Sequence, residues 1–98
     1  MTDNDIAFLT RLERVIASRI ESNDEHSYTA SLATAGVKRI SQKLGEEAVE
    51  TALAATSGNH DEFLDEAADL VYHLLVLLRA RECSLADVAR VLEARHSP

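Results

Sequence analysis

The chain contains a single proline, Pro98, which is its last residue, so no proline interrupts the sequence internally. Apolar residues recur at spacings of three and four, and no segment alternates apolar and polar residues over the length of a strand. Because this spacing places apolar side chains on one face of a helix, the sequence predicts an all-α fold. We expect helices over residues 5–21, 37–56 and 61–81 and from residue 84 onward, with a polar loop at 22–31 and a short helical turn that ends at Gly36.

The short connections between these segments favour a bundle of four to five helices in which neighbouring helices run antiparallel. The predicted helix at 61–81 is apolar nearly all round beyond Asp69, so we expect it to be central or buried on two sides. A chain of 98 residues has a large surface relative to its interior. We therefore expect one domain over residues 1–98, completed by formation of a homodimer or a higher homo-oligomer.

Composition and charge narrow the classes of partner. A net charge of -7 argues against nucleic acid, because binding its backbone requires a surplus of Lys and Arg. The apolar run 70–78 is too short for a membrane span, which takes about 20 residues. The single cysteine, Cys83, cannot form an internal disulfide or a zinc cluster, and the polar start 1–5 lacks the features of a signal peptide. We expect a cytoplasmic protein with a small-molecule ligand and neither a nucleic-acid nor a membrane partner.

Carboxylates on two predicted helices form the most informative pattern. Glu46, Glu47 and Glu50 lie on one helix, and Glu66 and Asp69 lie on the next. Residues three or four apart share a helix face, so Glu47 with Glu50 and Glu66 with Asp69 each form a pair. Antiparallel packing can bring the two pairs together, and such a cluster of like charges calls for protonation or a bound cation. An all-oxygen site without His or Cys ligands selects a hard cation, Mg²⁺ or Mn²⁺.

The alternative is that these carboxylates form ordinary solvated helix faces, as most glutamates do. Two observations weaken it. Glu47 projects about 20° from Ile40, at the edge of an apolar face, and the stripe formed by Glu66, Asp69 and His73 continues into apolar residues. Spacing alone leaves both interpretations open, because it does not show that the pairs meet.

The pattern Glu46-Glu47-x-x-Glu50 followed by Glu66-x-x-Asp69 resembles the signature of the all-α nucleotide pyrophosphohydrolases related to MazG. The surrounding segments at 27–32, 42–50 and 66–75 resemble the phosphoribosyl-ATP pyrophosphohydrolase family, and the likeness continues through 84–88. It covers nearly the whole chain and is weakest in the first helix and near Gly58. The sequence is thus identified as similar to one family within the MazG-like, all-α superfamily.

The resemblance implies an activity: hydrolysis of the nucleotide phosphoribosyl-ATP to phosphoribosyl-AMP and pyrophosphate, the second step of histidine biosynthesis. Some family members carry a zinc-dependent cyclohydrolase domain ahead of this one. The given sequence contains neither such a domain nor the set of cysteines that it needs, so we expect the stand-alone form. The resemblance also implies a Mg²⁺ site, with Mn²⁺ as an alternative ion. Glu46 is then either a further ligand or a base that helps deprotonate the attacking water, and Glu47 is the other candidate for that base. The implied metal ligands are Glu47, Glu50, Glu66 and Asp69.

Other side chains near the motifs are candidates with two interpretations each. Lys43 lies one turn before Glu47 and either assists catalysis, by balancing carboxylate charge or reaching a phosphate, or forms a plain salt bridge. His73 either orients a carboxylate or touches the substrate, or is a buried, hydrogen-bonded residue. The hydroxyl groups of Tyr28, Thr29 and Ser31 either bind ribose or phosphate or belong to a capped turn. Arg39 is a further phosphate-binding candidate.

Two other functions fit the same sequence. A house-cleaning nucleotide pyrophosphatase would share the metal site and differ in its base pocket, whereas a non-catalytic helical dimerisation module would bind no Mg²⁺. No Gly-x-x-x-x-Gly-Lys pattern occurs in the chain, so phosphate groups are expected to be held through metal and side chains.

Overall fold

The computed structural model describes residues 2–98 and contains five α-helices and, within that range, no strand. The helices are α1 (Asp3–Ser22), α2 (Tyr28–Ala35), α3 (Val37–Ser57), α4 (His60–Ala80) and α5 (Leu85–His96). The predicted all-α fold is confirmed. The long helices begin and end within two residues of the predicted positions.

Capping residues fix where the helices begin. The side chain of Asn59 accepts a hydrogen bond from the Glu62 amide at the start of α4, and acidic residues fill the first turn of that helix. At the start of α5, Ser84 and Asp87 form a capping box in which each side chain accepts a hydrogen bond from the other's backbone amide. Both beginnings agree with the sequence interpretation.

The predicted loop at 22–31 is too long, because its last four residues are helical. Ser27 caps α2, and its hydroxyl accepts a hydrogen bond from the Ala30 amide at 3.2 Å. Ser, Asn and Asp are common in loops and also at helix N-caps, so composition alone did not separate the two. Helix α2 ends at Ala35, and Gly36 follows as its C-cap. The φ of Gly36 is 97°, an angle that residues with a Cβ atom rarely adopt.

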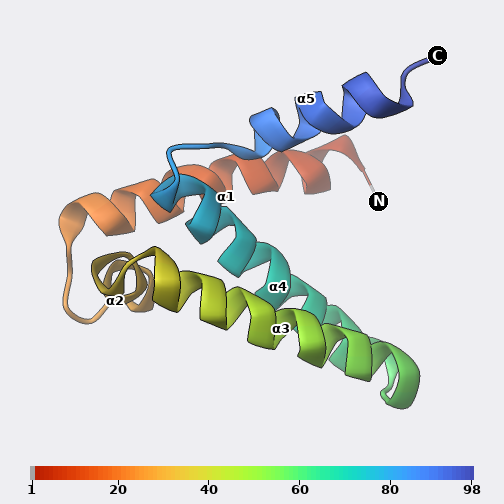
Figure 1. Cartoon of the computed structure of the whole chain (residues 1–98), viewed down its shortest axis with the longest axis horizontal. Coiled ribbons are helices and arrows are strands. Elements are labelled where there is room, and N and C mark those ends of the chain that lie inside the picture. Colours follow the sequence, from red (N-terminus) through yellow and green to blue (C-terminus); the bar gives the residue numbers. More distant parts are fainter. Residues whose placement is uncertain (1) are drawn as a thin grey trace.

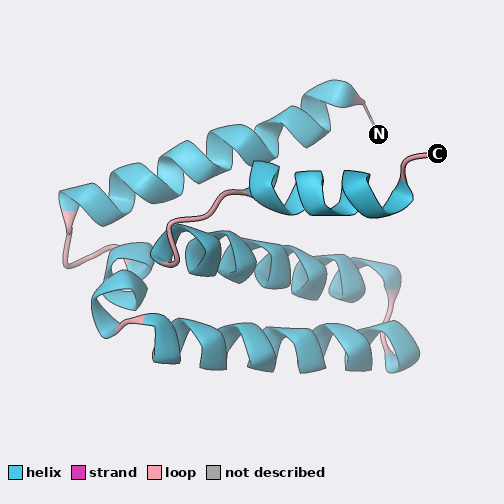
Figure 2. Cartoon of the chain, turned by 45° about the horizontal axis from the view of Figure 1, so that its top comes forward, coloured by secondary structure: helices cyan, strands magenta, loops and turns pink. Residues whose placement is uncertain are grey.

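Helices α3 and α4 form an antiparallel pair joined by a short turn, and the two run side by side in Figures 1 and 2. Helix α4 also contacts α1 and α2, so it has the central position that its apolar circumference predicts. The short α2 lies between the end of α1 and the start of α3 (Figure 1). This arrangement places the motif-bearing faces of α3 and α4 next to each other.

The hydrophobic core lies where four helices meet. Ile16 of α1, Leu32 of α2, Ile40 of α3 and Leu75 and Val76 of α4 form one buried cluster. All five are aliphatic, as expected for a chain with only 4% aromatic residues. The core therefore joins α1 and α2 to the α3–α4 pair and fixes the orientation of the facing helices.

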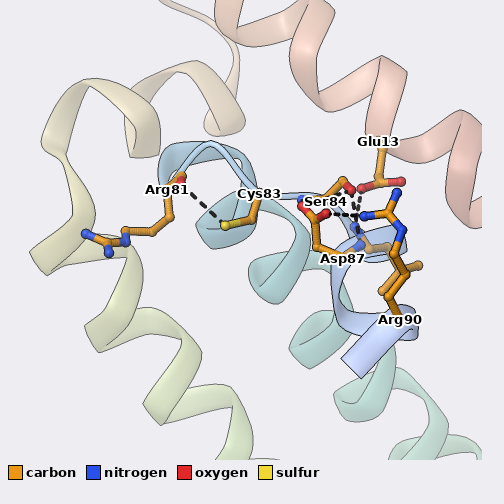
Figure 3. Close-up of polar contacts among 7 residues, drawn as sticks. Glu13, Arg81, Cys83, Ser84, Asp87 and Arg90 are labelled. Atoms are coloured by element: carbon orange, nitrogen blue, oxygen red, sulfur yellow. Dashed lines mark hydrogen bonds and ion pairs between the residues drawn. The ribbon is translucent and has the colours of Figure 1, made fainter. Parts of the chain in front are cut away.

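Helix α5 lies along α1 (Figures 1 and 2) and is held at its start by a residue of α1. The Leu85 amide donates a hydrogen bond of 2.8 Å to Oε2 of Glu13. In Figure 3 the Glu13 carboxylate points toward the beginning of α5, beside Ser84 and Asp87. A carboxylate at a helix N-terminus satisfies an unpaired amide and interacts favourably with the helix dipole. No helix within residues 2–98 combines the length and the apolar character needed to cross a bilayer.

Candidate active site

The facing sides of α3 and α4 carry a cluster of three carboxylates. Glu47 of α3 and Glu66 and Asp69 of α4 each place one carboxylate oxygen so that these atoms lie within 4.8 Å of one another. Glu66 and Asp69 share a face because they are three residues apart on one helix, and the antiparallel pairing of α3 and α4 adds Glu47. The structure thus brings together carboxylates that the sequence could only place on separate helices.

Two atoms of this cluster are buried without a partner. Glu47 is only 8% exposed, and its Oε2 atom, like Oε2 of Glu66, has no hydrogen-bond partner among the described residues. A buried carboxylate oxygen without a partner is costly, since it loses water and gains nothing in return. The burial of Glu47 also argues against the solvated-face interpretation. A cation bound between α3 and α4 would satisfy both atoms, so the donor set fits a metal ion.

Glu50 extends the cluster toward solvent. A side-chain hydrogen bond between Glu66 and Glu50 is the main cause that raises the pKa of Glu66 from its ordinary 4.5 to about 7, and desolvation and the charges of Glu50, Glu47 and Asp69 act in the same direction. The four carboxylates therefore interact strongly before any metal binds. Three of the four predicted metal ligands thus meet in one cluster, and the fourth, Glu50, lies beside Glu66.

The raised pKa of Glu66 predicts how the stability of the metal-free protein depends on pH. Folded Glu66 holds a proton up to about pH 7, whereas unfolded Glu66 releases it near 4.5. The folded state binds more protons across this window, so the contribution of Glu66 to the free energy of unfolding decreases as pH rises. Thermal melts in the presence of a chelator should show this decrease between pH 5 and pH 8, and excess Mg²⁺ should offset it at the upper end.

Glu66→Gln should remove most of this pH dependence, because the amide does not titrate. Glu62→Gln, on the same helix outside the cluster, should preserve it. A slope that is unchanged in Glu66→Gln would show that other groups cause the effect.

Lys43 borders the cluster on α3. Its Nζ lies 3.4 Å from Oε1 of Glu46 and 3.8 Å from Oε1 of Glu47. The hydrogen bond with Glu46 is the main cause that raises the pKa of Lys43, followed by the nearby Tyr28 hydroxyl and the two glutamates. Glu46 itself is 44% exposed and lies outside the three-carboxylate cluster. Lys43 therefore joins a buried carboxylate of the cluster to an exposed one beside it.

A cavity of about 560 Å³ opens next to the cluster. Asp69 belongs to both, so a ligand bound in the cavity can also reach the carboxylates. The cavity walls come from the end of α1, the following loop, the start of α2 and the middle of α4. The lining residues are Arg19, Asp24, His26, Ser27, Tyr28, Thr29, Asp69, Tyr72 and His73.

Hydrogen bonds fix the cavity wall between α2 and α4. Nδ1 of His73 lies 2.7 Å from the carbonyl oxygen of Asp69 and donates to it, so in the neutral ring Nε2 accepts from the Tyr28 hydroxyl, also at 2.7 Å. Thr29, which is 1% exposed, hydrogen-bonds through its hydroxyl to the hydroxyl of Tyr72. His73 thus has the hydrogen bonds of a buried structural residue and at the same time lines the cavity.

The remaining candidates lie elsewhere. The Ser31 hydroxyl donates to the Tyr28 carbonyl oxygen at 2.8 Å and is outside the cavity lining, and Arg39 is exposed, also outside that lining. The structure adds Arg19 and His26, which the sequence analysis did not single out. Arg19 has the spacing of an ordinary polar-face residue of α1, and His26 belongs to a polar loop, so neither carried a signal in the sequence alone.

Comparisons with known proteins identify the family of the chain. Residues 9–96 match the family described as phosphoribosyl-ATP pyrophosphohydrolase. The chain is 55% identical over 92 residues to the histidine biosynthesis bifunctional protein HisIE of Photobacterium profundum, 55% over 96 residues to that of Pasteurella multocida and 56% over 89 residues to that of Xylella fastidiosa. These alignments cover 94%, 98% and 91% of the chain but only 44%, 48% and 43% of the relatives. The chain thus spans less than half the length of these relatives.

Proposed function

The chain belongs to the phosphoribosyl-ATP pyrophosphohydrolase family, and we propose that it hydrolyses phosphoribosyl-ATP to phosphoribosyl-AMP and pyrophosphate in histidine biosynthesis. The observation that carries this proposal is the meeting of Glu47, Glu66 and Asp69 across two helices, with their oxygens within 4.8 Å. A non-catalytic helical module would have no use for buried, unpartnered carboxylate oxygens. We propose that residues 1–98 act as one catalytic domain with a cytoplasmic location, as the sequence predicts.

The proposed cofactor is Mg²⁺, with Mn²⁺ as a substitute, held by Glu47, Glu50, Glu66 and Asp69. The support is the donor set, which consists of carboxylate oxygens alone, and the two buried oxygens without partners. When bound, the ion would neutralise triphosphate charge and make a water molecule more acidic. Calorimetric titration of Mg²⁺ into the metal-free protein tests this assignment, and the absence of binding at millimolar Mg²⁺ would contradict it.

The residues of the chain supply the remaining steps. Glu46 lies outside the three-carboxylate cluster and is held by Lys43 at 3.4 Å, so it is available to accept the proton of the attacking water; Glu47 is the alternative base. The water oxygen forms a bond to phosphorus while the bridging P–O bond between the α and β phosphates breaks. Attack at either phosphorus gives the same two products. Lys43 is placed to hold a phosphate oxygen when it is not paired with Glu46.

We propose that the protein is a homodimer in which the exposed apolar residues of α3 and α4 form the interface. Val49 and Leu53 lie four residues apart on α3 and are 59% and 61% exposed, and Leu64 and Val71 lie seven apart on α4 and are 50% and 37% exposed. Each pair follows helical spacing, so each forms an apolar stripe. Such stripes on a small chain commonly mark a protein interface.

Leu53→Asp is predicted to convert the dimer to a monomer at micromolar concentration. A buried carboxylate without a partner in the interface should weaken association by about 100-fold or more. Light scattering measures the change, and Leu92→Asp, at an exposed position of α5, should remain dimeric. A native chain that is monomeric at these concentrations would contradict the proposed assembly.

A further inference from the structure

We propose that Arg19 binds the 5′-phosphate of the second ribose, the phosphoribosyl group that ATP lacks, and so distinguishes phosphoribosyl-ATP from ATP. This inference rests on the proposed function. It concerns the cavity next to the carboxylate cluster and assigns the part of the substrate that lies farthest from the triphosphate.

The shared residue Asp69 sets the direction in which the substrate lies. If the carboxylate cluster holds the triphosphate, the nucleoside beyond it extends past Asp69 into the adjoining cavity. The volume of about 560 Å³ falls within the range of small-molecule sites. The side chains of Tyr28 and Tyr72 line this space and offer flat surfaces to the base and hydroxyl contacts to the sugars.

Arg19 is the one Arg or Lys side chain among the residues that line this cavity. The protein has a net charge of -7, so the positive charge of Arg19 at a ligand cavity contrasts with the negative charge of the molecule as a whole. No ion pair engages Arg19 among residues 2–98, although Arg79 on the neighbouring helix is paired with Glu21 at 3.9 Å. A guanidinium matches the geometry of a phosphate and can donate two parallel hydrogen bonds to it.

The surroundings of Arg19 support an anion at the same place. His26 also lines the cavity, and so do the N-cap Ser27 and the first two residues of α2, Tyr28 and Thr29. Asp24 is the one carboxylate besides Asp69 that lines the cavity, and its Oδ1 accepts a hydrogen bond from the His26 amide at 2.9 Å. That hydrogen bond directs Asp24 into the loop backbone. Glu25, outside the lining, has its Oε1 3.7 Å from Nε2 of His26. Arg19, His26 and the start of α2 together form a site suited to a phosphate group.

Steady-state kinetics on the native chain, Arg19→Gln and Arg14→Gln test the proposal. Arg14 lies on the same helix outside the cavity lining, so it is a matched control. The KM for phosphoribosyl-ATP should rise by about 10- to 100-fold in Arg19→Gln, the effect expected for loss of a charge-assisted hydrogen bond. The inhibition constant of ATP, which lacks the second ribose, should stay within about twofold. Arg14→Gln should resemble the native chain in both measurements.

Binding of ribose 5-phosphate gives a readout that does not depend on turnover. Amide resonances of Tyr28 and Thr29 should shift when this probe is added to the native chain, and they should not shift with ribose or in Arg19→Gln. Equal losses for phosphoribosyl-ATP and ATP, or no loss in Arg19→Gln, would overturn the inference. An inactive native chain would instead refute the proposed function, while the response to ribose 5-phosphate would still decide whether the phosphate site exists.

Discussion

Replacing Glu50 with glutamine or Asp69 with asparagine is expected to lower pyrophosphate release by about 10²- to 10³-fold, comparable to the loss of one preorganised electrostatic contact at a reacting phosphate or carbonyl. Each amide keeps the shape of the side chain but removes one negative charge that would hold the cation. Higher Mg²⁺ concentration should recover part of the activity, because the first effect of the substitution is on metal affinity. Activity measured against Mg²⁺ concentration separates this loss from a loss of turnover.

The same variants should remain folded. Removing a charge from a cluster of repelling carboxylates relieves strain when no metal is present, so their melting temperatures in chelator should equal or exceed that of the native chain. Glu62→Gln and Glu93→Gln lie on the same kind of helical surface outside the cluster, and their rates should stay within a few fold. If the cluster variants keep the Mg²⁺ dependence of these controls, the carboxylates do not form a metal site.

Ile40→Ala is expected to cost about 2–5 kcal/mol of folding free energy, the range for large-to-small changes in a packed core. Ile40 is 0% exposed and lies at the centre of the cluster that joins α1, α2, α3 and α4. Chemical denaturation should show a lower midpoint, and the loss is large for a domain of this size.

Ile6→Ala provides the comparison for this prediction. Ile6 is 52% exposed on α1, so truncating it should change stability by no more than about 0.5 kcal/mol. Equal losses at Ile6 and Ile40 would show that the core does not lie where the structure places it.

The helices and the carboxylate-bearing faces could be predicted from sequence because both depend on local periodicity. Seven residues separate Glu47 from Ile40, which puts both on one face of α3, and the structure buries both. The same reasoning places Glu66 and Asp69 together on α4. The capping box at the start of α5 and the acidic first turn of α4 are likewise local.

What the sequence did not reveal depends on contacts between distant segments. The cavity wall forms only when the loop after α1 turns through Asn23, with a φ of 49°, and α2 packs against α4. Arg19 and His26 become neighbours of Tyr72 through that packing, and no spacing rule connects them. The start of α2 was missed for a different reason, since Ser27 serves equally well in a loop and at a helix cap.

The contact of Glu13 with α5 is another example of an interaction between distant segments that the sequence did not reveal. Glu13 accepts a hydrogen bond from the first amide of α5, 72 residues away in sequence, and no spacing within α1 indicates this contact. A capping interaction within one segment can be recognised from spacing, but one between segments cannot.

The most direct test of the account is pyrophosphate release measured side by side on phosphoribosyl-ATP, ATP and dCTP, with Mg²⁺ and with excess chelator. We expect release from phosphoribosyl-ATP that depends on Mg²⁺ and exceeds release from the other two nucleotides by at least about 10-fold, since the loss of even one charged phosphate contact has about that effect. Release from ATP and dCTP but not from phosphoribosyl-ATP would identify a house-cleaning nucleotide pyrophosphatase and contradict the account, and so would release from phosphoribosyl-ATP that persists in excess chelator.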